Sequence, residues 1–89
     1  MKISKDIDEY GTIRYRNEQG QLHREDGPAI ECANGDKYWY LNDKLHREDG
    51  PAIEYVSGHK VWFLNGEELT EQEFNDFLLK KRLKKILEL

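Results

Sequence analysis

The ten-residue stretch LHREDGPAIE occupies residues 22–31 and recurs without a change at residues 45–54. The two copies are 23 residues apart, and similarity extends on both sides of them, matching 20–35 to 43–58. A fixed period of this length is typical of repeat proteins, in which each unit packs on its neighbour. The sequence therefore predicts about two and a half units, degenerate at both ends.

Each unit is predicted to form a β-hairpin. Residues 52–56 alternate in polarity, and residues 60–64 are rich in β-branched and aromatic side chains, as strands are. Trp39 and Trp62 fall at equivalent positions of the 23-residue period, and Tyr15 aligns with Tyr38. The expected fold is mainly β, an elongated antiparallel meander of repeated hairpins.

Turn residues separate these predicted strands. Asn34-Gly35 is predicted to form a two-residue hairpin turn, because both residues tolerate positive φ, and Ser57-Gly58 is its counterpart. Further turns are expected at Asn42-Asp43 and Asn65-Gly66. Proline cannot donate a backbone hydrogen bond, so each Asp-Gly-Pro step is expected to bend the chain.

The last twenty residues predict a different structure. Thr70 and Glu73 have the spacing of a capping box, which marks the start of a helix. Apolar residues then follow largely at helical spacing, with no glycine or proline. The chain is thus expected to be one folded α+β domain, with hairpin repeats over 1–69 and an amphipathic helix over 70–89.

Composition narrows the class of protein. The 89 residues carry a net charge of −4. Residues 80–89 contain five lysines and arginines and one glutamate, a charge of +4, so the remainder carries −8. No apolar run approaches the roughly 18 residues of a membrane span, and the single cysteine, Cys32, excludes an internal disulfide. A soluble cytoplasmic protein is expected, with no membrane partner.

The repeat resembles a known family over about residues 13–66. Its period, its Tyr-x-x-Asn-Gly-x-Leu-His pattern and its hairpin meander are similar to MORN and MORN-like repeats. The octapeptide LHREDGPA is similar to a repeat of small proteins of tailed phages and some large DNA viruses. Ordinary MORN units carry glycine where Arg24 and Arg47 stand. The resemblance therefore implies a fold and a phage source, and no particular chemistry.

The repeated His-Arg-Glu-Asp segments, 23–26 and 46–49, have three interpretations: a metal or catalytic site, a surface for a partner, or a part of the fold. A histidine three residues before an aspartate could bind a metal or act as an acid–base pair. However, a feature that recurs at the period of the fold is more simply part of that fold. Arginine can bridge carboxylates and carbonyls, and aspartate can hydrogen-bond a bend. The structural interpretation is favoured, so no catalytic, metal or cofactor site is predicted.

Two other groups of residues are candidates for partner binding. Exposed aromatics anchor protein interfaces or stack on bases, although packing between units is their commoner use. Basic side chains of the helix could contact phosphate, lipid or an acidic protein, or simply face solvent. The residues assigned to partner binding are Tyr38, Trp39, Tyr40, Trp62, Lys80, Lys81, Lys84 and Lys85.

The helix also predicts self-association. Its apolar stripe is more than a thin sheet is expected to cover, so a homodimer through the helix is one predicted assembly. The stripe consists of Leu79, Leu83, Ile86 and Leu87.

The function expected is that of a non-enzymatic interaction protein. The sequence has no glycine-rich phosphate loop, metal cluster or nucleophile–base pair. If the phage resemblance holds, the expected partner is a host protein, such as a component of antiviral defence, which this protein would modulate or inhibit. The alternative is nucleotide or nucleic-acid binding through the basic helix and the aromatics.

Overall fold

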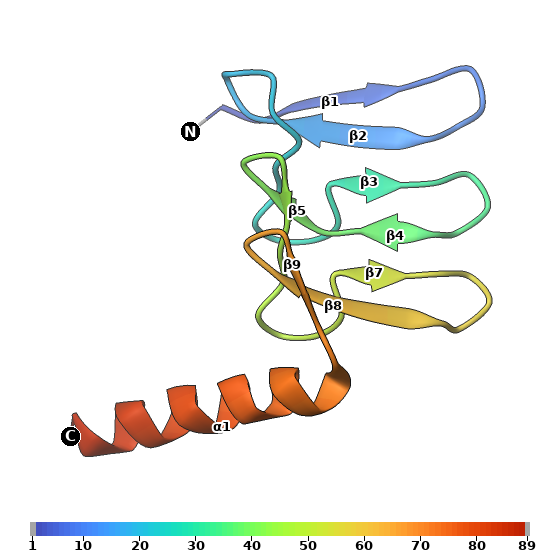
Figure 1. Ribbon diagram of the computed structural model, residues 1–89. Helices are drawn as coiled ribbons and strands as arrows, with labels where there is room; N and C mark the ends of the chain where they lie inside the picture. Colours follow the sequence, from blue (N-terminus) through green and yellow to red (C-terminus); the bar gives the residue numbers. More distant parts are fainter. Residues whose placement is uncertain (1, 89) are drawn as a thin grey trace.

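The computed structural model describes residues 2–88 as a stack of β-hairpins with one helix at the C-terminal end (Figure 1). Seven strands form one antiparallel sheet in the order β1-β2-β3-β4-β7-β8-β9, and β5 pairs with β6 apart from it. The predicted fold, a meander of hairpins with a C-terminal helix, is confirmed. The elements are β1 (Ser4–Ile7), β2 (Ile13–Arg16), β3 (Ile30–Glu31), β4 (Lys37–Tyr38), β5 (Tyr40–Leu41), β6 (Lys44–Leu45), β7 (Ile53–Glu54), β8 (Lys60–Leu64), β9 (Glu67–Leu69) and α1 (Glu71–Leu87).

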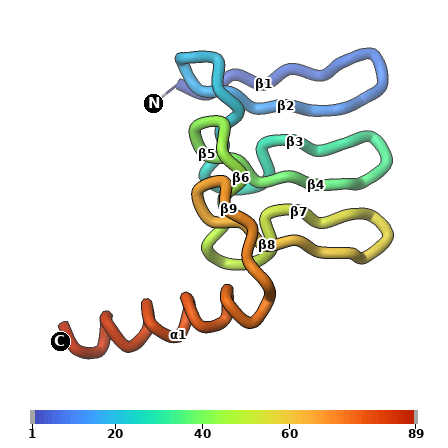
Figure 2. Tube along the Cα trace, in the orientation of Figure 1, coloured from blue at the N-terminus to red at the C-terminus, as the bar shows by residue number. Residues whose placement is uncertain are grey.

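The hairpins stand in two columns. Three long hairpins, β1–β2, β3–β4 and β7–β8, lie one above another on one side of the molecule (Figure 2). Three short turns, at residues 17–21, between β5 and β6, and between β8 and β9, form the second column (Figure 2). Within every unit the chain runs from one column to the other. Consecutive units are therefore joined by hydrogen bonds in both columns.

The long hairpins share one turn type, which differs from the prediction at residues 34–35. The Cys32 carbonyl accepts a hydrogen bond from the Gly35 N–H at 2.9 Å, and the Cys32 N–H donates to the Asp36 carbonyl at 2.9 Å. This geometry closes a three-residue loop in which only the glycine, at φ 103°, is left-handed. Equivalent bonds close the loops at Gly11 and Gly58. The predicted two-residue turn at Asn34-Gly35 is therefore wrong.

The short turns behave as predicted in two units and differ in the first. Asn42-Asp43 has φ values of 50° and 68°, and Asn65-Gly66 has values of 52° and 83°, as two-residue hairpin turns require. In the first unit the turn spans 17–21, with Gly20 at φ 79° and the Asn17 N–H bonded to the Gln21 carbonyl. The first turn is consequently one residue longer than the others.

This extra residue changes which side chains are equivalent. The Tyr15 carbonyl accepts a hydrogen bond from the His23 N–H at 3.0 Å, and the Trp39 carbonyl accepts one from the His46 N–H at 3.0 Å. Tyr15 thus occupies the place of Trp39, one position away from the predicted match with Tyr38. The alignment by a constant 23 residues is wrong there, because it cannot accommodate the longer loop.

The core is thin. Among residues 2–88 no large side chain is fully buried, and the buried apolar residues are Ala29, Ala52, Ile53 and Phe74. The two alanines sit at the same point of successive units, and their backbones bond to the neighbouring strands. Cys32 is half-buried, which raises the pKa of its thiol. With so little apolar burial, contacts between units carry much of the stability.

Helix α1 covers the last strands and then runs beyond the sheet (Figure 1). Its predicted capping box is present, since the Thr70 side chain accepts from the Glu73 N–H and the Glu73 carboxylate accepts from the Thr70 N–H. Phe74 is buried against the sheet, whereas the four stripe residues Leu79, Leu83, Ile86 and Leu87 are exposed. Within residues 2–88 no helix has the length and apolarity needed to cross a membrane.

Candidate interaction surface

The two copies of the repeated stretch form equivalent bends, here called the first bend (23–28) and the second bend (46–51). Their backbones leave the short-turn column at successive levels of the stack (Figure 1). A groove of about 500 Å³ lies between them, with Trp39 and Leu41 among its lining residues. Both bends direct carboxylates outward: the side chains of Asp26 and Asp49 are 86% and 85% exposed.

One arginine holds each bend in shape. In the second bend, Arg47 Nε donates to Asp49 at 2.7 Å, and its Nη1 donates to the Pro51 carbonyl at 3.1 Å and to Glu54 at 3.0 Å. Arg24 makes the same three contacts in the first bend. These bonds join both sides of the Gly-Pro step, and they account for the arginine and aspartate of the motif as parts of the fold.

Aromatic rings and glycines complete this packing. The Arg47 guanidinium lies over the Trp39 ring, and the Arg24 guanidinium lies over Tyr15. On the other side, a Cβ added at Gly50 would come within 3.0 Å of Arg47 Cζ, a distance shorter than normal contact. Gly27 has the same relationship to its arginine. The bends are therefore closely packed, with their backbone held by contacts to the arginine.

The histidines connect each bend to the next short turn. His23 Nδ1 accepts a hydrogen bond from the Asn42 N–H at 3.0 Å, and His46 Nδ1 accepts one from the Asn65 N–H at 2.9 Å. A neutral imidazole that accepts through Nδ1 carries its proton on Nε2. In both bends this Nε2–H points toward the glutamate two residues later, Glu25 or Glu48.

The glutamates of the two bends have different surroundings. Glu48 lies 3.1 Å from His46 Nε2 and also binds Lys81 of helix α1. The hydrogen bond from Lys81, followed by that from His46, lowers the pKa of Glu48. Glu25 is 77% exposed and lies 3.8 Å from His23 Nε2, which is beyond hydrogen-bonding distance. Within residues 2–88 this buried nitrogen has no hydrogen-bond partner.

The four aromatic residues assigned to partner binding are all half-buried. Tyr38 packs edge-on against Tyr55, with ring centroids 6.2 Å apart, and burial raises its pKa and that of Tyr40. Trp39 lies beneath Arg47, while Trp62 belongs to β8 in the third long hairpin. Each is only partly accessible, and Trp39 lines the groove between the bends, so their role in partner binding stays a prediction.

The four lysines assigned to partner binding are all exposed on α1. Lys81 reaches Glu48, and its Nζ lies 5.9 Å from the centroid of the Phe77 ring. Lys80, Lys81 and Lys84 line a groove of about 650 Å³ between the helix and Glu48. Lys85 is outside that groove. The structure thus brings one predicted basic residue to the second bend and leaves the others in solvent.

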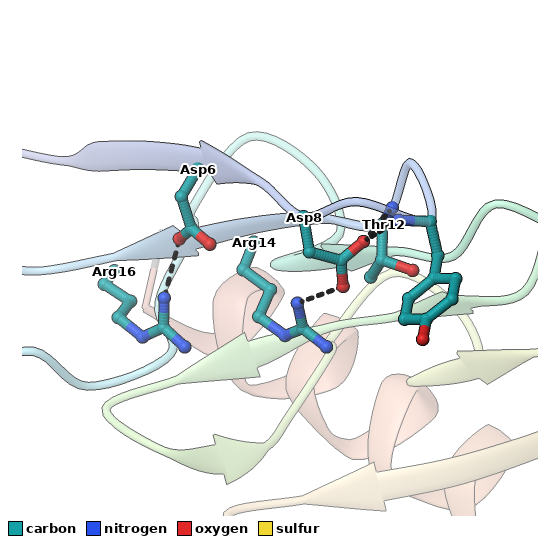
Figure 3. Close-up of polar contacts among 6 residues, drawn as sticks. Asp6, Asp8, Thr12, Arg14 and Arg16 are labelled. Carbon is teal, nitrogen blue, oxygen red and sulfur yellow. Dashed lines mark hydrogen bonds and ion pairs between the residues drawn. The ribbon is translucent and has the colours of Figure 1, made fainter.

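The first hairpin contains ion pairs that the sequence did not indicate (Figure 3). Asp8 accepts hydrogen bonds from the N–H groups of Tyr10 and Thr12, at 2.9 and 3.0 Å, and from Arg14 at 3.0 Å. These bonds, that from Arg14 first, lower the pKa of Asp8. An aspartate three residues before Gly11 is the signal that could have revealed this turn.

Function is not indicated by a metal site within residues 2–88 or by similarity to a known protein. Within residues 2–88, no group of three or more His, Cys, Asp or Glu side chains is placed to hold a metal ion. The candidate interaction surface therefore consists of the two acidic bends, the groove between them and the basic helix. No protein-family model, curated protein or solved structure matched this chain.

Proposed function

We propose that this chain is a non-enzymatic interaction protein that binds another protein through its two bends. The observation that carries the proposal is a pair of acidic bends held rigidly at successive levels of one stack. Glu25, Asp26 and Asp49 point into solvent from backbone that is fixed by arginine and histidine hydrogen bonds. A rigid surface loses little conformational entropy on binding, which favours recognition.

Charge indicates the kind of surface that the bends would bind. The chain outside residues 80–89 carries a charge of −8, and adjacent strands in a sheet are about 4.8 Å apart, so successive bends repeat every ~10 Å. A partner with basic side chains at that spacing would match both bends together. Complementary charge also accelerates association at low salt.

The source of the partner is inferred from the resemblance of the repeat. Because LHREDGPA is similar to a repeat of phage proteins, we infer that the partner is a host protein met in the host cytoplasm. A component of antiviral defence is the proposed target, which the bends would modulate or inhibit. The inference of a host partner is supported by the sequence resemblance, whereas binding through the bends is supported by their geometry.

Affinity capture from bacterial lysate tests the proposal. The full chain is compared with a variant carrying Glu25→Gln, Asp26→Asn and Asp49→Asn, which neutralises the three most exposed carboxylates of the bends. The matched control neutralises three exposed glutamates elsewhere, Glu9, Glu67 and Glu68. A specific partner should be retained by the control and lost by the bend variant. Equal capture by both variants would contradict the proposal.

Nucleic-acid binding is a second candidate, favoured by the exposed basic end of the helix. Lys80, Lys84 and Lys85 are exposed in the C-terminal part of α1. Phosphate contacts release counterions, so oligonucleotide binding through them should weaken steeply between about 50 and 200 mM salt. Fluorescence anisotropy with a single-stranded oligonucleotide tests this candidate, and no binding at the lower salt concentration would remove it.

The apolar stripe of α1 is a third contact surface, and we propose that two copies associate through it. Leu79, Leu83 and Ile86 are about half exposed and lie at helical spacing in the C-terminal part of α1. Two such stripes in contact would bring lysines of both copies close together. Association through the helix should therefore be weak at low ionic strength.

A further inference from the structure

The two bends have the same sequence, but the surroundings of the glutamate differ between Glu25 in the first bend and Glu48 in the second. In the second bend, His46 Nε2, the Glu48 carboxylate and the Lys81 ammonium form a continuous chain of hydrogen bonds. Lys81 is 33 residues away from Glu48 in sequence and belongs to another element of the fold. The carboxylate thus lies between a half-buried imidazole and an ammonium group.

The first bend contains the first two members of this chain. His23 is buried, with 4% of its side chain exposed, and its Nδ1 is already bonded to the Asn42 N–H. Its Nε2 faces Glu25 at 3.8 Å and is unpartnered within residues 2–88. Among the same residues, no lysine or arginine forms an ion pair with Glu25. A buried donor without an acceptor is unfavourable, so the unpaired Nε2–H favours movement of the carboxylate toward it.

We propose that the first bend is a binding site for a lysine side chain of a partner protein. The site consists of His23 and Glu25, and it takes an ammonium group in the way that Glu48 takes Lys81. The inference rests on the proposed function, which it deepens by naming the side chain that is recognised. The ammonium and the Nε2–H would then bind opposite sides of one carboxylate, as they do in the second bend.

The surroundings of Glu25 fit a lysine. Asp26 places a second exposed carboxylate beside it. Two grooves border the first bend, one lined by Trp39 and Leu41 and the other by Ile3 and Tyr15, so an aliphatic stem meets apolar surface near the carboxylates. Arg24, the basic side chain of the bend, is already bonded to Asp26 and Glu31, and Lys5 also lines the second groove. Two positive charges, Lys5 and Arg24, against three negative ones, Glu25, Asp26 and Glu31, leave a formal charge of −1 beside the first bend.

Lys81 also indicates which kind of segment would present the ligand. It is carried by helix α1, one turn after Phe77, whose ring its ammonium approaches. A peptide with the sequence of residues 70–89 reproduces this lysine, its aromatic neighbour and the helical propensity. We therefore use that peptide, supplied in trans to the full chain, as the probe. A matched peptide has glutamine in place of Lys80, Lys81, Lys84 and Lys85.

The experiment follows the histidine side chains of the full chain by long-range ¹H–¹⁵N NMR. On addition of the lysine peptide, the His23 Nε2 resonance should shift saturably, while His46, whose glutamate is already occupied, should change little. The glutamine peptide should produce no shift at His23. In the Glu25→Gln variant the dissociation constant for the lysine peptide should rise at least tenfold, and Glu9→Gln should leave it unchanged.

Three results would overturn the inference. The first is no shift of His23 at millimolar lysine peptide, and the second is equal affinity in the Glu25→Gln variant. The third is a dimer of the full chain that disappears in Glu25→Gln, because the occupant would then be a second copy instead of a separate partner. If the inference fails while capture of a partner still depends on Asp26 and Asp49, the proposed function stands without the lysine site.

Discussion

The guanidinium carbon of Arg47 lies 3.9 Å from the centroid of the Trp39 ring. The same guanidinium donates to an aspartate, a proline carbonyl and a glutamate, so one side chain joins the bend to the strands around it. In the preceding unit Arg24 lies 4.1 Å from the centroid of Tyr15 and makes the equivalent bonds. The stability of each bend should consequently depend on the planar shape of arginine as well as on its charge.

Replacing Arg47 by lysine tests this dependence. Lysine keeps the charge but cannot stack flat on Trp39, and its donors all lie on one nitrogen, whereas Arg47 uses both Nε and Nη1. Arg47→Lys should lower the free energy of unfolding by about 1–3 kcal/mol, measured by urea denaturation followed by tryptophan fluorescence. Arg82→Lys, at an exposed helix position, is the control and should change stability by less than about 0.5 kcal/mol. Equal stability of the two variants would show that charge alone matters.

Glycine should be required at Gly50 only because the Arg47 side chain lies against its Cα and leaves no space for a Cβ. The φ of Gly50 is not left-handed, so backbone strain does not oppose alanine there, but the added Cβ would meet Arg47 Cζ at 3.0 Å. We expect Gly50→Ala to cost about 1–3 kcal/mol in the wild-type background. In an Arg47→Ala background the cost should fall to near zero. Thermal denaturation of the four proteins gives the double-mutant cycle, and a cost that is the same in both backgrounds would refute the packing argument.

His46 should act through its Nδ1 acceptor. His46→Leu leaves the Asn65 N–H without that acceptor and should cost about 1–2 kcal/mol. His46→Asn places a side-chain oxygen near the position of Nδ1 and should cost less. Hydrogen exchange reports the bond directly: the Asn65 amide should exchange faster in His46→Leu, while the Asn42 amide, which is bonded to His23, keeps its protection. Faster exchange at both amides would indicate a general loss of structure.

Acid should weaken the contact between helix α1 and the second bend. The pKa of Glu48 is lowered by Lys81 and His46 in the folded protein. A lowered folded pKa means that the stabilisation is fully present above the unfolded value, about 4.3, and is lost as the pH falls through the folded value. Asp8, whose pKa is lowered by Arg14 and the hairpin N–H groups, contributes with the same sign.

The Glu48 contribution is isolated by comparing variants at two pH values. Glu48→Gln should reduce the loss of stability between about pH 5 and pH 3, as measured by chemical denaturation. Glu68→Gln, at an exposed position of β9, is the control. The assignment fails if Glu48→Gln retains the full pH dependence of the wild-type protein.

Salt should strengthen self-association through the helix. Because the lysines flanking the apolar stripe repel those of a second copy, screening favours the dimer. Light scattering should show more dimer at about 500 mM than at about 50 mM salt. Leu83→Glu, which places a charge in the stripe, should give a monomer at both concentrations. A monomeric wild-type protein at both would exclude a dimer through this surface.

Local signals in the sequence were sufficient for much of the fold. The turns at Asn42-Asp43 and Asn65-Gly66 follow from residues that tolerate positive φ, and the helix start follows from Thr70 and Glu73. The hairpin at Asn34-Gly35 was misassigned because the same dipeptide also fits a three-residue loop. That choice depends on the register of the flanking strands, which the dipeptide does not contain.

The difference between the two bends was harder to predict, because it arises from a contact between residues far apart in the sequence. Residues 23–28 and 46–51 are identical, yet only Glu48 meets a lysine, since the position of α1 is fixed by the burial of Phe74. The equivalence of Tyr15 and Trp39 depended on an insertion of one residue in an earlier turn. Periodicity indicated that the motif is structural, but the contact between a helix side chain and one copy of it required the tertiary structure.

The stack is not closed on itself, since β1 forms one edge of the sheet and α1 lies at the other end (Figure 1). Each interior unit contacts only the unit before it and the unit after it, so a further 23-residue unit could be inserted between them without disturbing either end. Such an insertion would lengthen the array by about 10 Å and add one more acidic bend. The number of acidic bends can thus change by duplication of a single segment of the gene, while the geometry of each bend stays the same.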